Sequence, residues 1–220
     1  MKEQLVEEII KQEWEMFNAV NNVGGRSTCQ EDPKTFEIMR ASQAEAWPEN
    51  LLASYHDDLE QAKANGRNLM TEKYARMMET TVPQEYAAIA SLLPPIDDET
   101  LELIDKIVRT FLTWKIETTK KYPYLASQDR MVYTEDDSPS ETSFETYFRG
   151  ELKTYSPKTV QLFYEMTLEC QKAGANLEET YLFNSVKKYG YESLKQAEDQ
   201  AYQQLYRKLG RQGCSMGGCG

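Results

Sequence analysis

Two cysteines near the end of the chain have the residue type and spacing that suggest chemistry most directly. Cys214 and Cys219 are separated by four residues, two of them glycine, and Met216 lies between them. Thiolates are nucleophiles and soft metal ligands, and glycine lets the backbone close around a bound ion or a partner. Two thiols do not complete a four-ligand zinc site, so we expect a soft metal such as Cu(I), an iron–sulfur cluster or dithiol redox cycling. Cys29 is a candidate further ligand.

Two other interpretations of the tail stay open. Terminal segments often carry cysteines that have no specific role. Alternatively, the folded body is a recognition handle, and a partner enzyme modifies the Cys-rich C-terminus. If the tail carries metal or redox chemistry, or if a partner enzyme modifies it, the expected partner is another protein, which docks through the tail.

Paired Glu and Arg residues form a second candidate site. Glu37 and Arg40 are three residues apart, and Glu145 and Arg149 are four apart, so each pair shares one face of a helix. The plain interpretation is a set of salt bridges that ties two halves of the protein together. The functional interpretation places both arginines in one cleft, where two guanidinium groups would hold a carboxylate or phosphate. The expected lining of that cleft is Asn21, Ser42, Gln43, Trp47, Tyr147 and Glu151, with Glu151 as the candidate catalytic base.

Other polar residues are weaker candidates. The segment 18–30 is rich in amides, hydroxyls and glycine, but it lacks the lysine and spacing of a phosphate-binding loop, so a plain connecting loop is favoured. The single histidine, His56, lies off the apolar face of its helix and is expected at the surface. No Glu-x-x-His pattern supports a di-iron site, so a solvated acidic face is expected for the first helix, with Glu7, Glu8, Glu13 and Glu15.

Helices are the elements that must position these residues. Apolar residues recur at 3.6-residue spacing near the N-terminus, and Asp32-Pro33 and Asp97-Asp98 are helix start signals. In the long helix after residue 97, the expected inward residues are Leu101, Ile104, Ile107, Val108, Phe111 and Leu112. The polar region 122–142 is expected to be a long loop, and no segment alternates as a strand would. Expected helices cover about 1–20, 33–47, 48–65, 68–80, a short segment after 83, 97–121, 141–155, 157–173, 176–189 and 192–209.

An internal similarity suggests how the helices are organised. Six residues recur 109 positions later in the chain: Pro48, Tyr55, Leu59, Glu60, Lys63 and Ala64 match Pro157, Tyr164, Leu168, Glu169, Lys172 and Ala173. We therefore predict an internally duplicated all-α bundle, built of two pseudo-symmetric half-domains of about 100 residues each. Residues 1–209 would form this single domain, with halves at about 1–93 and 97–209, and 210–220 would be a flexible Gly/Cys tail.

Composition excludes several classes of function. The formal net charge of the 220 residues is -11, which repels nucleic acid. No apolar run is long enough to span a bilayer, and the acidic start of the chain does not resemble a signal peptide. We therefore expect a cytoplasmic protein with no nucleic-acid or membrane partner, in which four cysteines do not form a disulfide framework.

Several motifs resemble a bacterial family known as domain-of-unknown-function family 4125. They are the segments 13–17, 20–26, 29–30, 39–43, 68–78 and 143–152, and the resemblance covers the chain to about residue 195. Among the candidates above, the family motifs include Asn21, Arg40, Gln43, Arg149 and Glu151, together with Trp14, Gly24 and Gly25. The resemblance implies no activity or cofactor, and the cysteine tail lies beyond it.

Three hypotheses follow from the sequence. The leading one is a helical scaffold that presents the Cys214–Cys219 dithiol for metal, iron–sulfur or redox traffic. The second is a small-molecule enzyme or ligand-binding protein with an Arg-anchored cleft between the halves. The third is a recognition body whose C-terminus is modified by a partner enzyme.

Overall fold

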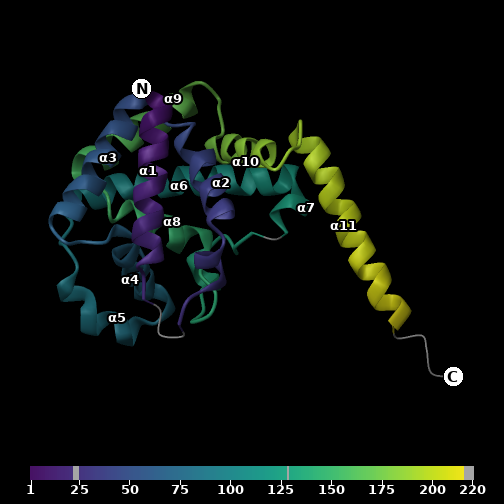
Figure 1. The fold of residues 1–220 in the computed structure, drawn as a ribbon, viewed down its shortest axis with the longest axis horizontal. Coiled ribbons are helices and arrows are strands. Elements are labelled where there is room, and N and C mark those ends of the chain that lie inside the picture. The colour runs from purple at the N-terminus through teal and green to yellow at the C-terminus, as the bar shows by residue number, and fades with distance from the viewer. Residues whose placement is uncertain (22–24, 128, 216–220) are drawn as a thin grey trace.

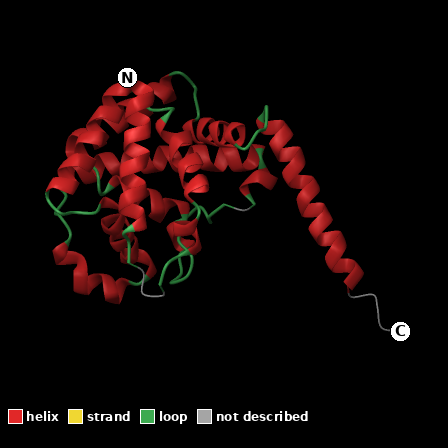
Figure 2. Cartoon of the chain, viewed as in Figure 1, coloured by secondary structure: helices red, strands yellow, loops and turns green. Residues whose placement is uncertain are grey.

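The computed structural model describes residues 1–21, 25–127 and 129–215, with side chains described as far as residue 207. In this part of the chain there are eleven α-helices, short 3-10 segments and no strand, so the all-α prediction is confirmed (Figure 2). The N-terminal helices are α1 (Lys2–Asn18), α2 (Pro33–Ala44), α3 (Glu49–Ala64), α4 (Leu69–Thr81) and α5 (Pro83–Ile89). The C-terminal helices are α6 (Asp98–Lys121), α7 (Pro123–Ala126), α8 (Phe144–Leu152), α9 (Pro157–Lys172), α10 (Leu177–Lys188) and α11 (Leu194–Ser215).

Side-chain caps determine where several helices begin. The Asp32 carboxylate accepts the Thr35 backbone N–H at 3.0 Å, and Pro33 occupies the first helical position. Asp97 accepts the Thr100 N–H in the same way, at 2.8 Å. Each carboxylate satisfies a donor that has no partner within the helix. Both helix starts predicted from the sequence are confirmed.

The region 122–142 differs from the loop expected there. It contains α7 and a 3-10 turn, Thr134–Asp136. The backbone N–H groups of Tyr124 and Leu125 donate to the carboxylate of Glu198, on α11, at 2.9 and 2.8 Å. This carboxylate caps α7 from a distant part of the chain. The rest of the described part of 122–142 is loop, as expected, and α7 was not predicted because the local sequence does not contain its capping partner.

Two helices, α1 and α6, each pack mainly against neighbours from their own part of the chain (Figure 1). Helix α1 packs against α2, α3 and α4, and α6 packs against α8, α9 and α10. The two groups meet through α3 on α9, α4 on α8 and α2 on α10. One large hydrophobic cluster therefore contains residues from both groups.

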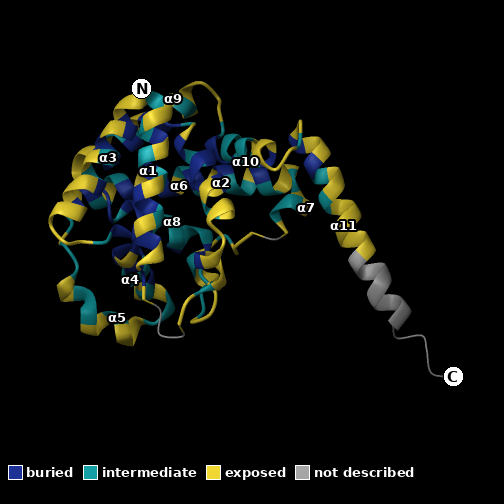
Figure 3. Cartoon of the chain, in the orientation of Figure 1, coloured by how far each residue is buried: buried dark blue, intermediate teal, exposed yellow. Residues whose placement is uncertain are grey.

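The apolar face of α6 forms much of this core. Ile104, Ile107 and Phe111 have no exposed surface, whereas Leu101 and Leu112 are half-buried. Buried surface lies on the inner sides of the packed helices and exposed surface on their outer sides (Figure 3). The inward face predicted from the spacing is thus confirmed for its central residues.

Helix α11 leads away from this body (Figure 1). Its first turns pack against α7 and α10, where Leu194 and Ala197 form a small second core with Val186. Farther along, Tyr202, Leu205 and Tyr206 are exposed.

The α4 and α10 helices begin with the same device. Asn68 caps α4 and also donates its Nδ2 to the Met16 carbonyl on α1, at 2.8 Å. Asn176 caps α10 and donates to the Trp114 carbonyl on α6, at 3.1 Å. A glycine in the left-handed conformation lies two residues before each asparagine. The two groups of helices share this local geometry, and the duplication itself stays a prediction.

Candidate functional site

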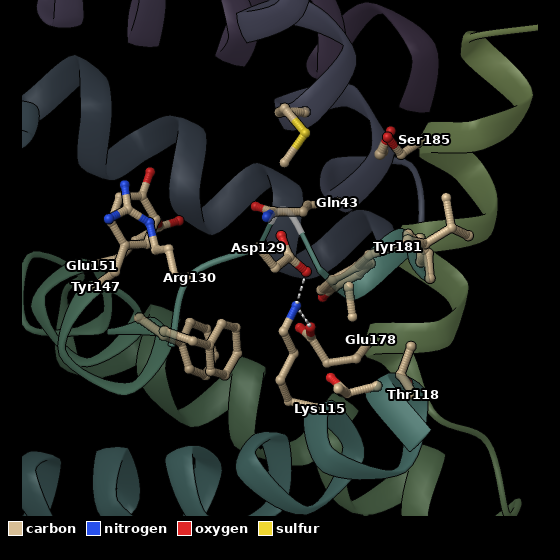
Figure 4. Close-up of a pocket in the computed structure, with 18 of the residues that line it drawn as sticks. Gln43, Lys115, Thr118, Asp129, Arg130, Tyr147, Glu151, Glu178, Tyr181 and Ser185 are labelled. Atoms are coloured by element: carbon tan, nitrogen blue, oxygen red, sulfur yellow. Dashed lines mark hydrogen bonds and ion pairs between the residues drawn. The ribbon is translucent and has the colours of Figure 1, made fainter. Parts of the chain in front are cut away.

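A cavity of about 280 Å³ lies between α2, α6, α8 and α10, with α7 and the segment after it at one side (Figure 4). It lies where α2 of the N-terminal group meets α10 of the C-terminal group. Residues from both groups of helices, from Met39 to Ser185, therefore line it. Binding sites for small molecules are commonly concave, mostly apolar spaces of this kind between helices.

Aromatic side chains form the apolar part of the lining. The Trp47 indole N–H donates to the Tyr181 hydroxyl at 2.9 Å, which fixes the two rings relative to each other. The Trp47 ring also meets Phe163 edge-on, with centroids 5.5 Å apart. Phe144 and Phe148 stack at 5.7 Å on the α8 side. These rigid flat surfaces favour a ligand with an apolar, planar portion.

Three charged side chains of the lining form ion pairs with one another. Lys115 Nζ lies 2.7 Å from an Asp129 carboxylate oxygen and 3.5 Å from a Glu178 oxygen (Figure 4). Glu178 is on the first turn of α10 and is 9% exposed, whereas the Asp129 side chain is 46% exposed. We refer to Lys115, Asp129 and Glu178 as the cavity triad.

Burial raises the pKa of Glu178 to about 7. The Lys115 ammonium offsets part of this effect, and the nearby Asp129 carboxylate adds to it. Burial lowers the pKa of Lys115, but the two carboxylates outweigh this and raise it overall. Because a group with a pKa near 7 is present in both protonation states at neutral pH, Glu178 is suited to give or take a proton there.

A second group of charges is buried beside the cavity, and one of its members, Glu151, also lines the cavity. Arg40 donates from Nε to Glu13 at 2.7 Å, pairs with the same carboxylate through a second nitrogen, and reaches Glu151 at 3.0 Å. Lys73 Nζ lies 2.5 Å from the other Glu151 oxygen. We call Glu13, Arg40, Lys73 and Glu151 the inner network. It contains two cations and two anions, so its formal charge is balanced.

Neutral side chains complete the hydrogen bonding of the inner network. The Tyr55 hydroxyl donates to Glu13 at 2.7 Å, and the Tyr155 hydroxyl donates to Glu151 at 2.9 Å. Burial alone would raise the pKa of Glu151, but Arg40 and Lys73 outweigh it and hold that pKa well below its usual range. Glu151 therefore stays ionised and is a weak base.

Tyr147 links the inner network to the cavity. Lys73 Nζ lies 3.4 Å from the centroid of its ring, and the guanidinium carbon of Arg130 lies 4.6 Å from it. Tyr147 and Arg130 both line the cavity. The ring therefore makes cation–π contacts with one buried cation and with one exposed cation.

Comparison with known proteins gives one match. The model of a family described as "Protein of unknown function (DUF4125)" matches residues 3–199. The chain belongs to this family. No curated protein and no solved structure matches the DUF4125 chain.

Some of the predicted site residues of the DUF4125 protein do meet. Gln43, Trp47 and Glu151 line the cavity, as do Ser42 and Tyr147. Arg40 lies behind this lining, and its guanidinium is occupied by Glu13, Glu151 and the Gln43 side-chain oxygen.

Arg149 and Asn21 lie elsewhere, so the expected cleft anchored by two arginines is not formed. Arg149 pairs with Asp105 and, at 3.5 Å, with Glu145. Successive helical residues turn by about 100°, which places Arg149 and Glu151 on nearly opposite sides of α8. Asn21 is exposed in the connection after α1 and is not part of the cavity lining.

The connection after α1 has structural contacts. Arg26 donates to the Asn18 carbonyl and side chain and to the Gln30 carbonyl. Gln30 is buried and donates to the Phe17 and Val20 carbonyls at the end of α1. These bonds support the plain interpretation of this segment as a connecting loop.

The prediction of a solvated acidic face on α1 was wrong for Glu13, which has no exposed surface. Ile9, Glu13 and Phe17 follow one another at four-residue spacing, so Glu13 lies on the apolar stripe. Lys73 and Lys115 have the same signal, since Lys73 lies on the stripe between Leu69 and Met77 and Lys115 follows Phe111 by four residues. A charged residue inside an apolar stripe was therefore the sequence signal that could have indicated both the inner network and the cavity triad. His56 is half-buried, and its ring contacts Gln12 and Glu8.

The thiol predictions are only partly covered by the structure. Cys29 is exposed, and its Sγ lies 3.0 Å from the Ser27 hydroxyl. Burial raises the pKa of Cys170. The Cys214 side chain, Met216 and Cys219 lie outside the described residues, so the dithiol and the soft metal or iron–sulfur cluster expected there stay predictions. Among the described side chains, no group of three His, Cys, Asp or Glu residues could hold a metal ion.

Proposed function

We propose that this protein binds a small organic molecule in the cavity between α2, α6, α8 and α10, and that Glu178 exchanges a proton with it. The observation that carries the proposal is the cavity triad, three charged side chains brought together on the wall of a cavity that is also lined by several aromatic rings. A protein gains little stability by burying charges beside an empty space, because desolvation opposes the ion pairs. A ligand that binds to these groups would explain why they lie on the cavity wall.

The size and lining of the cavity indicate the kind of ligand. Its volume of about 280 Å³ is at the lower end of the range for small-molecule sites. Trp47 and Tyr181 offer flat apolar surface, and the triad offers convergent polar groups at one side. A compact molecule with a planar apolar part and one polar end fits both features.

A cytoplasmic location and the absence of a nucleic-acid partner belong to the same proposal. In the part of the chain that the structure describes, no helix has the length and apolar composition needed to cross a bilayer. The net charge of -11 opposes binding to a polyanion.

The test is a thermal-shift screen of a metabolite library against three forms of the full chain. Ser185→Phe adds a ring to a residue that lines the cavity, and Lys187→Phe adds the same ring at an exposed residue of the same helix. We expect compounds that stabilise the wild type and K187F but not S185F. The proposal is contradicted if the same compounds stabilise all three forms, or if no compound stabilises the wild type.

A further inference from the structure

We propose that the cavity selects a cation, namely a primary or secondary amine joined to a planar apolar group. This inference rests on the proposed function and specifies its ligand class. The charge of the cavity triad carries it. The cavity triad has two carboxylates and one ammonium, so an ionised triad has a deficit of one positive charge.

The geometry identifies which carboxylate is left to a ligand. Lys115 lies closer to Asp129, at 2.7 Å, than to Glu178, at 3.5 Å. Within the described part of the chain, that long contact is the closest ion pair of Glu178. A carboxylate has about four acceptor sites. Glu178, nine-tenths buried and on the cavity wall, therefore retains unused acceptors that a ligand N–H can fill.

The nearby cations do not offer an equivalent site for an anion. Arg40 and Lys73 are occupied by Glu13 and Glu151 in the inner network. Arg130 remains, but it is exposed, lies over the Tyr147 ring and donates to the Thr142 carbonyl at 3.0 Å. An anionic ligand would thus meet one exposed guanidinium and the Lys115 ammonium, which already pairs with two carboxylates, and those carboxylates would repel it.

The aromatic lining also favours a cation. The electron-rich faces of Trp, Tyr and Phe attract ammonium groups. Lys115 already makes such a contact, with its Nζ 5.2 Å from the Phe144 centroid. A ligand amine beside Glu178 would have Tyr181, three residues farther along α10, within the same lining. The net charge of -11 adds a long-range attraction for cations.

Three probes of similar shape test this inference by calorimetry on the full chain at pH 8, where Glu178 is mostly ionised. They are 2-phenylethylamine, 3-phenylpropionate and 2-phenylethanol. We expect the amine to bind the wild type at least about tenfold more tightly than either other probe, because a charge-assisted hydrogen bond contributes more than a neutral one.

Two matched variants locate the effect. Glu178→Gln removes the charge from the cavity wall, and Glu179→Gln removes a charge one residue later, from an ion pair with Lys121 that does not line the cavity. We expect E178Q to weaken amine binding about tenfold and E179Q to change it less than twofold.

The outcomes separate this inference from the proposed function. Tighter binding of 3-phenylpropionate or 2-phenylethanol, lost in S185F, would keep the cavity as a ligand site and overturn the choice of a cation. Unchanged amine affinity in E178Q would also overturn it. If none of the three probes binds, the inference is wrong, and the library screen still decides the proposed function.

Discussion

The inner network and the cavity triad contain the same kinds of residue in opposite situations. In the inner network, Arg40 and Lys73 balance Glu13 and Glu151, and two tyrosine hydroxyls supply further hydrogen bonds. In the cavity triad, Lys115 is the cation for two carboxylates, and its contact with one of them, Glu178, is long, at 3.5 Å. The first group is buried, and only its Glu151 reaches the cavity wall, whereas all three members of the second group line the cavity.

The difference separates charge that holds the fold from charge that is available to a ligand. The inner network connects α1, α2 and α4 with α8, so it ties together helices from both groups. The cations of the inner network lower the pKa of Glu151, so that it stays ionised, whereas burial at the cavity wall raises the pKa of Glu178 to about 7. Burial alone thus does not identify a carboxylate that is available to a ligand. The number of ion pairs and hydrogen bonds that the carboxylate already makes is the better guide.

The largest effect that tests this comparison is expected from removing a carboxylate of the inner network. In Glu151→Gln, Arg40 and Lys73 lose their shared carboxylate and one buried positive charge is left uncompensated. We expect the free energy of unfolding to fall by about 3–5 kcal/mol, measured by urea denaturation at pH 7. The carboxylate's contribution is present above its unfolded pKa of 4.5 and is lost as the pH falls below that value, since its folded pKa is lower.

The control for this variant is Glu79→Gln, which breaks an ion pair with Lys153 whose Glu79 side chain is 47% exposed. We expect it to cost less than about 1 kcal/mol. Equal losses in the two variants would show that the inner network does not hold the helices together.

The cavity triad should give the opposite dependence of stability on pH. Between pH 4.5 and about 7 the folded protein binds more protons at Glu178 than the unfolded chain does, because burial raises the folded pKa. The contribution of Glu178 to the free energy of unfolding should therefore fall by about 3 kcal/mol as the pH rises through this range and stay level above it.

Glu178→Gln removes this dependence. At pH 8 we expect the variant to be more stable than the wild type, with the difference vanishing near pH 4.5, in urea titrations at each pH. A destabilised variant at pH 8 would place Glu178 among the structural charges and end the contrast with the inner network.

A smaller effect sharpens the comparison between the two groups of helices. Asn68→Ala and Asn176→Ala each remove an N-cap and a bond to the central helix of their own group. We expect each to lower the free energy of unfolding by about 1–2 kcal/mol, and by similar amounts. A loss confined to one variant in chemical denaturation would show that the two groups do not depend on this device alike.

The smallest effect on stability is expected from the tail. Removing residues 214–220 should change the free energy of unfolding by less than about 0.5 kcal/mol, because the hydrophobic clusters of the body lie before them. The dithiol hypothesis predicts that anaerobically purified full-length protein holds soft metal or a reactive dithiol that the shortened form lacks. Identical metal content and thiol reactivity elsewhere in the two forms would end that hypothesis.

Much of the helical architecture could be predicted because its signals are local. The caps at Asp32 and Asp97 and the apolar stripe around Ile107 and Phe111 are fixed by residues within one or two turns. The α7 helix was missed because its cap, Glu198, comes from α11.

The site was harder to predict, since its residues meet only through packing. Gln43, Trp47 and Glu151 were expected to line one cleft between the two halves of the chain, and they do line one cavity. Lys115 and Glu178 come together only because α6 packs on α10. The apolar stripe shows that Lys115 is buried, but no local pattern names its partner.

The most direct test of the cavity as the ligand site uses the three tryptophans of the chain. Their indole N–H groups give separate NMR signals, and of the three only Trp47 lines the cavity. On titration with 2-phenylethylamine, we predict a saturable shift of the Trp47 signal, while the Trp14 and Trp114 signals stay nearly unchanged. A Trp47 signal that does not move, or that moves no more than the other two, would contradict the account.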